Sequence, residues 1–169
     1  MAKVDLYPDF REFLKSLNSE GVEYLVVGGY AVIYYGYRRA TDDLDIWIAI
    51  SPENADRVSR VLQQFGGFRA SKVKPSMFLE APKTFIFGRE PVRIDILTRP
   101  SGVDFKACFA RRTVVEWDGI KVPLISFKDL KQNKQASGRA KDLADLENLP
   151  PTFPPPRKGP GRRRPRRKT

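Results

Sequence analysis

Apolar residues recur every three or four positions in several stretches of the chain, which is the spacing of an amphipathic helix. In residues 9–19 this spacing places Phe10, Phe13, Leu14 and Leu17 on one face, and Gly21 ends the helix. The same pattern predicts further helices over residues 30–35, from the capping pair Ser51-Pro52 to about Phe65, over 126–137 and over 139–149.

Short apolar or alternating runs rich in β-branched and aromatic residues predict strands. These runs are residues 24–27, 44–50, 77–80, 84–87, 92–97, 114–117 and 120–124. Asp118-Gly119 separates the last two runs and favours a hairpin turn. Because helices are inserted between the early strands and follow the last one, we expect an α/β or α+β domain around one mixed sheet.

The numbers of histidine and cysteine residues limit the kinds of catalysis that this chain can perform. The 169 residues include no histidine and one cysteine, Cys108. The absence of histidine excludes Ser-His-Asp and Cys-His catalysis and zinc bound by histidine. One cysteine allows neither an internal disulfide nor a thiolate cluster, which indicates an intracellular protein. Catalysis would therefore use carboxylates, Lys, Arg, hydroxyls or a hard metal ion.

The net charge of +11 is concentrated in residues 150–169. That segment holds eight of the 31 Lys and Arg, seven of the 14 prolines and no acid. We therefore expect a domain over residues 1–149 and a disordered basic tail that attracts RNA or an acidic protein. The alternative is a solubilising segment without a partner. No run is long and apolar enough for a membrane span, so the expected location is cytoplasmic.

The residues that carry chemistry are glycines and acids placed around strands. Gly28-Gly29 follows an apolar run and opens a helix, so its backbone N–H groups can approach phosphate oxygens. Asp43 and Asp45 alternate along a strand, so both carboxylates project from one face. Asp95 lies in another apolar strand. If the two strands pair, the three acids form one cluster, whose natural occupant is a hard divalent cation.

In this order the motifs resemble the nucleotidyltransferases of the DNA polymerase β superfamily. The fuller pattern is similar to the AbiEii-like and related small bacterial nucleotidyltransferases of toxin–antitoxin systems, over roughly residues 22–149. The positions that carry the resemblance are Gly28-Gly29-x-Ala31, Arg39-x-Thr41-x-Asp43-Leu44-Asp45-Ile46, Lys134 and Gly138-Arg139-x-Lys141-Asp142-x-x-Asp145-x-x-x-Leu149.

The resemblance implies a mixed central sheet flanked by helices, with helices at the C-terminal end. It also implies Mg²⁺- or Mn²⁺-dependent transfer of a nucleoside monophosphate from an NTP to a hydroxyl of RNA, tRNA, a protein or a small molecule, and a cognate toxin or antitoxin partner. Asp43, Asp45 and Asp95 would be the catalytic and metal-binding residues. The implied phosphate-binding residues are Gly28, Gly29, Arg39, Thr41, Lys134, Arg139 and Lys141.

Simpler interpretations exist for the same residues. Asp95 could form an ion pair with Arg93 or Arg39, although its flanking isoleucines favour the metal interpretation. Asp142 and Asp145 could belong to an ordinary charged helix face. For the whole chain, the alternatives are a catalytically quiet module that binds nucleic acid or a partner, and a nucleotide-sugar glycosyltransferase, which normally needs a longer chain.

Overall fold

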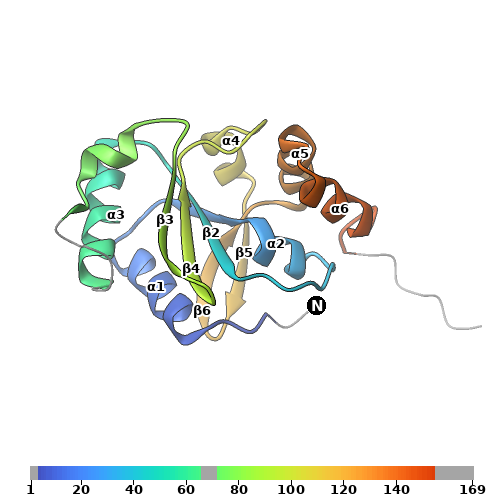
Figure 1. Ribbon diagram of the computed structural model, residues 1–169, viewed down its shortest axis with the longest axis horizontal. Coiled ribbons are helices and arrows are strands. Elements are labelled where there is room, and N and C mark those ends of the chain that lie inside the picture. Colours follow the sequence, from blue (N-terminus) through green and yellow to red (C-terminus); the bar gives the residue numbers. More distant parts are fainter. Residues whose placement is uncertain (1–3, 66–71, 155–169) are drawn as a thin grey trace, which may run out of the picture.

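A six-stranded mixed sheet forms the centre of the computed structural model, which describes residues 4–65 and 72–154 (Figure 1). The strand order is β3-β4-β2-β1-β6-β5. Pairs β2–β4 and β1–β6 are parallel, and the other neighbours are antiparallel. The strands are β1 (Tyr24–Val27), β2 (Asp43–Ile48), β3 (Thr84–Arg89), β4 (Val92–Leu97), β5 (Thr113–Trp117) and β6 (Ile120–Leu124).

Helices cover both faces of this sheet. Helices α1 and α3 lie on one side, and α2, α5 and α6 lie on the other (Figure 1). The helices are α1 (Pro8–Ser19), α2 (Gly28–Tyr34), α3 (Pro52–Phe65), α4 (Phe105–Ala110), α5 (Phe127–Ser137) and α6 (Ala140–Asn148), with the 3-10 helix η2 (Pro75–Leu79). The expected α+β domain with one mixed sheet is therefore confirmed.

Two elements differ from the expectation. Of residues 77–80, predicted as a strand, 77–79 belong to η2 and Glu80 caps it; the fully buried Phe78 packs against the Phe85 ring in a T-shaped arrangement. A run as short as the three apolar residues of 77–79 does not distinguish a strand from a helical turn, and Pro75 favours the helical start. Helix α4 was not expected, although Asp104 caps it by accepting a hydrogen bond from the Ala107 N–H.

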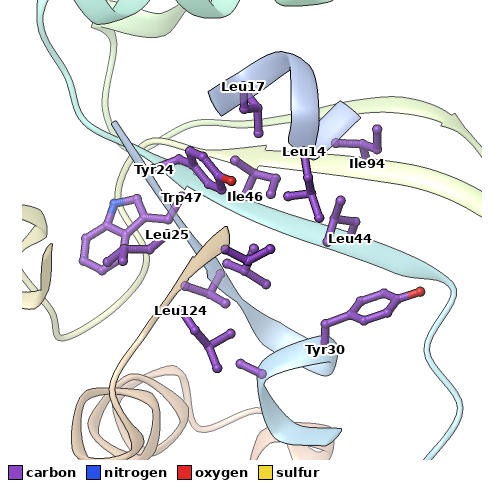
Figure 2. Packing of buried hydrophobic residues seen from close by; sticks show 14 of the residues in the cluster. Leu14, Leu17, Tyr24, Leu25, Tyr30, Leu44, Ile46, Trp47, Ile94 and Leu124 are labelled. Carbon is purple, nitrogen blue, oxygen red and sulfur yellow. The ribbon is translucent and has the colours of Figure 1, made fainter. Parts of the chain in front are cut away.

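The alternation along β2 separates apolar from polar side chains. Leu44, Ile46 and Ile48 are fully buried, and Figure 2 shows Leu44 and Ile46 near Leu14 of α1. Burying each such side chain stabilises the fold by roughly 2 kcal/mol. The intervening residues of β2, which include Asp43 and Asp45, must point to the opposite face. Burial of one face of β2 thus fixes the direction of the carboxylates on the other.

The segment expected to form the basic tail begins with residues in contact with the domain. Phe153 packs against the rings of Tyr34, Tyr35 and Phe127 at centroid distances of 5.7, 4.9 and 6.0 Å. The prediction of disorder otherwise falls on residues 155–169, which lie outside the described residues. Among the described helices, none has the length and hydropathy needed to cross a membrane.

Candidate functional site

A cavity of about 610 Å³ lies over the polar face of β2 and β4 and is bounded by α2, α5 and α6. It brings together residues that are more than a hundred positions apart in the sequence. All ten residues named from the sequence line it: Gly28, Gly29, Arg39, Thr41, Asp43, Asp45, Asp95, Lys134, Arg139 and Lys141. The glycine, acidic and C-terminal motifs therefore form one site.

Strand pairing places the carboxylates side by side. In the parallel β2–β4 pair, Asp45 is the register partner of Asp95, and Asp43 is the partner of Arg93. The strand of Asp95 thus pairs with the strand of Asp43 and Asp45, which is the pairing that the predicted acid cluster required. Because register partners on one face are neighbours, the charges of Asp43, Asp45 and Asp95 interact directly.

Asp45 is the acid with the least compensation. Burial raises its pKa first, and the carboxylates of Asp95 and Asp43 add to the effect, so that the pKa of Asp45 is about 7. The Lys134 ammonium and a hydrogen bond from the Gly29 N–H act in the opposite direction. A carboxylate in this state gains strongly from a nearby cation.

Asp95 already has a cation. Arg93 donates to both of its carboxylate oxygens, at 2.8 Å from Nε to Oδ1 and 2.8 Å from Nη2 to Oδ2. Hydrogen bonding to Asp95 correspondingly raises the pKa of Arg93 above its usual range. The ion pair between Arg93 and Asp95, the less favoured interpretation of Asp95 from the sequence, is thus present in the structure. Arg93 has two acidic neighbours on its face of the sheet, Asp95 two positions on along β4 and its register partner Asp43 on β2.

The donor set for a metal ion is partly free. Asp43 Oδ1 is buried without a hydrogen-bond partner among the described residues, and its nearest cationic atom is Arg93 Nε at 3.9 Å. Asp45 supplies a second hard oxygen donor beside it. Within residues 4–65 and 72–154, however, no group of three or more acidic, His or Cys side chains is arranged to hold an ion. Asp43 and Asp45 fit a divalent cation, whereas Asp95 would first have to release Arg93.

Gly28 and Gly29 allow the chain to pass close to these acids. Gly28 has a positive φ of 66°, and a Cβ there would collide with the Asp45 carboxylate. A Cβ on Gly29 would collide with Thr41. Thr41 itself donates from its hydroxyl to the Asp43 carbonyl at 3.3 Å, which fixes its side chain at the start of β2, close to Gly29 of α2. Close approach therefore requires glycine at both positions, and the positive φ requires it at Gly28 as well.

Substituting Gly28 with alanine tests this close approach. We expect Gly28→Ala to lower the free energy of unfolding by about 2 kcal/mol, because positive φ costs an L-residue about 1 kcal/mol and the collision with Asp45 adds to it. Gly138→Ala is the matched control, since Gly138 has φ of 64° and a Cβ there meets only the Gln135 carbonyl at 3.7 Å. Equal losses for the two variants in urea unfolding would contradict the close approach.

The wall formed by α5 and α6 contains a buried ionic network. The Lys134 ammonium lies 2.9 Å from both Asp142 Oδ1 and Asp145 Oδ2. Arg39 donates to both Asp145 oxygens, at 2.7 and 3.0 Å, and Arg139 donates to Asp142 at 2.8 Å. Burial alone would raise the pKa of Asp142, but hydrogen bonds from Lys134 and Arg139 hold it at about 2. Asp145 also has a lowered pKa, through Arg39 and Lys134.

This network separates the predicted phosphate-binding cations into two groups. Arg39 and Lys134 are buried or half-buried and are held by Asp145 and Asp142. The Arg139 side chain is 78% exposed although it contacts Asp142. Lys141 is exposed and makes no ion pair with the described part of the chain. Of the four predicted cations, Arg139 and Lys141 are therefore the most accessible to a ligand.

Several residues of the cavity were not among the site residues expected from the sequence. Arg93 and Arg99 add two guanidinium groups to its lining, and Asn133 and Ser101 add polar groups. The Asn133 amide donates to the Ser101 carbonyl at 2.9 Å and so ties α5 to the loop after β4. Arg93 had a signal in the sequence, since it alternates with Asp95 and must share its face. The others depend on the packing of α5 and left no such signal.

Comparison with solved structures identifies the fold. No family model matches the sequence, and no curated protein matches it significantly. The structure is similar to that of a candidate nucleotidyltransferase, TM1012, from Thermotoga maritima, with a TM-score of 0.55, 21% identity, and coverage of 82% of this chain and 88% of the other. The chain therefore has the nucleotidyltransferase fold.

Two further structures share this fold. An antigenic nucleotidyltransferase-like protein from Paracoccidioides brasiliensis is 19% identical, with a TM-score of 0.53 and coverage of 82% of this chain and 72% of the other. The lincosamide antibiotic adenylyltransferase LnuA, solved with lincomycin bound, is 17% identical, with a TM-score of 0.54 and coverage of 85% and 96%. At these identities the similarity defines the architecture, and the chemistry has to be argued from the cavity.

Proposed function

We propose that this protein transfers a nucleoside monophosphate from an NTP to a hydroxyl acceptor, with Mg²⁺ as the cofactor and Mn²⁺ as a substitute. One observation carries the proposal: on a nucleotidyltransferase fold, the glycine pair, the three acids and the C-terminal cations line the same cavity. Such convergence of separate motifs on one concave site supports a shared chemical role.

The residues have distinct roles in this proposal. The Gly28 and Gly29 backbone, with the exposed cations of Arg139 and Lys141, would hold the triphosphate. Asp43 and Asp45 would hold the divalent ion, and Asp95 would join them once Arg93 releases it. When bound, the ion neutralises charge on the entering and leaving oxygens of an in-line displacement. Asp95 would accept the proton of the attacking hydroxyl. Lys134 and Arg39 would shape the cavity through their contacts with Asp142 and Asp145.

The acceptor is proposed as a class, a hydroxyl on RNA, on a protein side chain or on a small molecule. The basic residues after position 156 favour RNA or another polyanion, because clustered Lys and Arg bind phosphate backbones. LnuA, which is an antibiotic adenylyltransferase by description, provides a precedent on this fold for a small-molecule acceptor. The four motifs support the AbiEii-like branch and with it a toxin–antitoxin partner.

The experiment is a transfer assay with labelled NTPs, Mg²⁺, and total tRNA or cell lysate as the acceptor. We expect label transfer by the full chain and a loss of at least ~100-fold in the double variant Asp43→Asn with Asp45→Asn. Asp56→Asn is the control, since Asp56 is an exposed acid of α3 that does not line the cavity. Transfer that persists in the double variant would exclude these acids as the catalytic group.

The second candidate function is a binding module without catalysis. The Arg93–Asp95 ion pair favours it, since it occupies the acid that would accept a proton. In this case the full chain would bind an NTP or RNA in a filter or calorimetric assay and transfer no label with any acceptor. The same preparation therefore distinguishes the two functions.

A further inference from the structure

Arg93 occupies an unusual position for a cation inside an acidic site. Its guanidinium makes two hydrogen bonds of 2.8 Å to Asp95 and lies 3.9 Å from the unpartnered Asp43 Oδ1. Its backbone is the register partner of Asp43 on the neighbouring parallel strand. The guanidinium therefore contacts the same two carboxylates that a divalent ion shared by Asp43 and Asp95 would contact.

The charges explain why a cation is needed there. Asp43, Asp45 and Asp95 bring three carboxylates to one sheet face, and like charges this close destabilise one another unless a cation lies among them. Lys134, the other nearby cation, is already held between Asp142 and Asp145 at 2.9 Å. Arg93 is thus the group that neutralises the acids while no other ion is bound.

Arg93 is also able to leave. Its side chain is 29% exposed to the cavity that it lines, whereas the Lys134 side chain is only 7% exposed between Asp142 and Asp145. A planar guanidinium binds phosphate oxygens in the same bidentate manner as carboxylate oxygens. In the cavity, two oxygens of a triphosphate could consequently accept the two hydrogen bonds that Arg93 now donates to Asp95.

We propose that Arg93 is an internal counter-ion that competes with the divalent cation for Asp43 and Asp95, and that it transfers its two hydrogen bonds to the triphosphate when the metal and the nucleotide bind together. This inference rests on the proposed function for the identity of the metal. It predicts weak metal binding by the protein alone and stronger metal binding with nucleotide. Arg93 thereby couples the two ligands. The triphosphate draws Arg93 away from the acids that bind the metal, and the metal frees Arg93 to bind the triphosphate.

The test measures Mn²⁺ binding by electron paramagnetic resonance of the free ion, using the full chain without nucleotide. We expect Arg93→Gln to lower the Mn²⁺ dissociation constant about tenfold, because the variant has no ion pair to break. The matched control is Arg89→Gln, an exposed arginine near the same turn of the hairpin that does not line the cavity, which should leave the constant unchanged. Unchanged or weaker Mn²⁺ binding in Arg93→Gln would overturn the inference.

Arg93→Lys provides a second test if the glutamine variant does not fold. Lysine keeps the charge but loses the bidentate geometry, so Mn²⁺ should bind more tightly than to the wild type, by less than the tenfold gain. With a non-hydrolysable NTP, the wild type should gain more Mn²⁺ affinity than either variant. Equal gains in all three proteins would show that Arg93 does not couple the ligands.

The outcome also separates this inference from the function on which it rests. If the wild type binds Mn²⁺ and Asp43→Asn with Asp45→Asn abolishes binding, the metal site stands, and the Arg93 variants alone decide the inference. If Mn²⁺ binding is the same in the wild type and in that double variant, the proposed metal site fails together with the inference.

Discussion

Replacing Lys134 with methionine is expected to lower the free energy of unfolding by about 3 kcal/mol. Lys134 is 6% exposed, and its ammonium contacts Asp142 and Asp145, which are themselves almost fully buried. Removing one member of a buried ionic network leaves the remaining charges without compensation, which typically costs about 3–5 kcal/mol. We place the expected loss at the lower end because Arg139 and Arg39 still contact the two acids.

The control for this variant is Lys128→Met, in which an exposed lysine of the same helix is replaced. Its effect should stay within about 0.5 kcal/mol, as is usual for surface positions. Urea unfolding monitored by circular dichroism measures both. A loss below about 1 kcal/mol for Lys134→Met would mean that the charge of Lys134 contributes little to the free energy of unfolding. Apolar contacts would then be what holds α5 and α6 in place.

Asparagine at position 45 is expected to stabilise the protein at neutral and basic pH. The pKa of Asp45, raised chiefly by burial to about 7, lies well above the value of an unfolded aspartate, so folding favours its protonated form. This favourable contribution is complete below about pH 4 and is lost as the pH rises through about 7. Between pH 4 and pH 8, Asp45→Asn should therefore gain on the wild type by on the order of 2 kcal/mol, after allowance for partial exposure to the cavity.

The sign and the metal dependence make this prediction specific. Other acids with shifted pKa values, such as Asp142 and Asp145, are present in both proteins and cancel in the difference. Unfolding curves at several pH values without divalent ions give the difference directly. Millimolar Mg²⁺ should stabilise the wild type and reduce the gap at pH 8. If the difference in free energy of unfolding between Asp45→Asn and the wild type does not change with pH, ionisation of Asp45 does not destabilise the folded protein, and the prediction is wrong.

The sequence allowed the site to be located because its key residues sit on regular elements. The alternation of Leu44 and Ile46 with Asp43 and Asp45 fixes the face of both acids without any tertiary information. Asp95 was assigned to the same site on the condition that its strand pairs with β2. That pairing depends on strand order, which local pattern does not determine, and the sheet shows it.

The contacts within the site were less accessible to sequence reasoning. Asp142 and Asp145 have the spacing of a solvent-exposed helix face, yet both are buried, as is Lys134 of the neighbouring helix α5. A periodic pattern of charges does not reveal whether the opposing surface is water or another charged helix. The partner of Asp95 was likewise undetermined, since Arg93 and a metal ion satisfy a buried carboxylate equally well. Which ion pairs form depends on the positions of the side chains in the folded protein, and the pattern of residues along the sequence does not determine these positions.

The Arg39–Asp145 pair joins residues 106 positions apart. A ribosome releases the chain from its N-terminus, so the glycine pair and all three carboxylates emerge before α5 and α6 exist. During that interval the nascent protein has the three acids of the cavity, but it lacks α5 and α6, which enclose them, and Lys134, whose ammonium joins those two helices. Only a fully synthesised domain can therefore enclose a ligand, and folding must wait for contacts of long sequence separation, which form slowly.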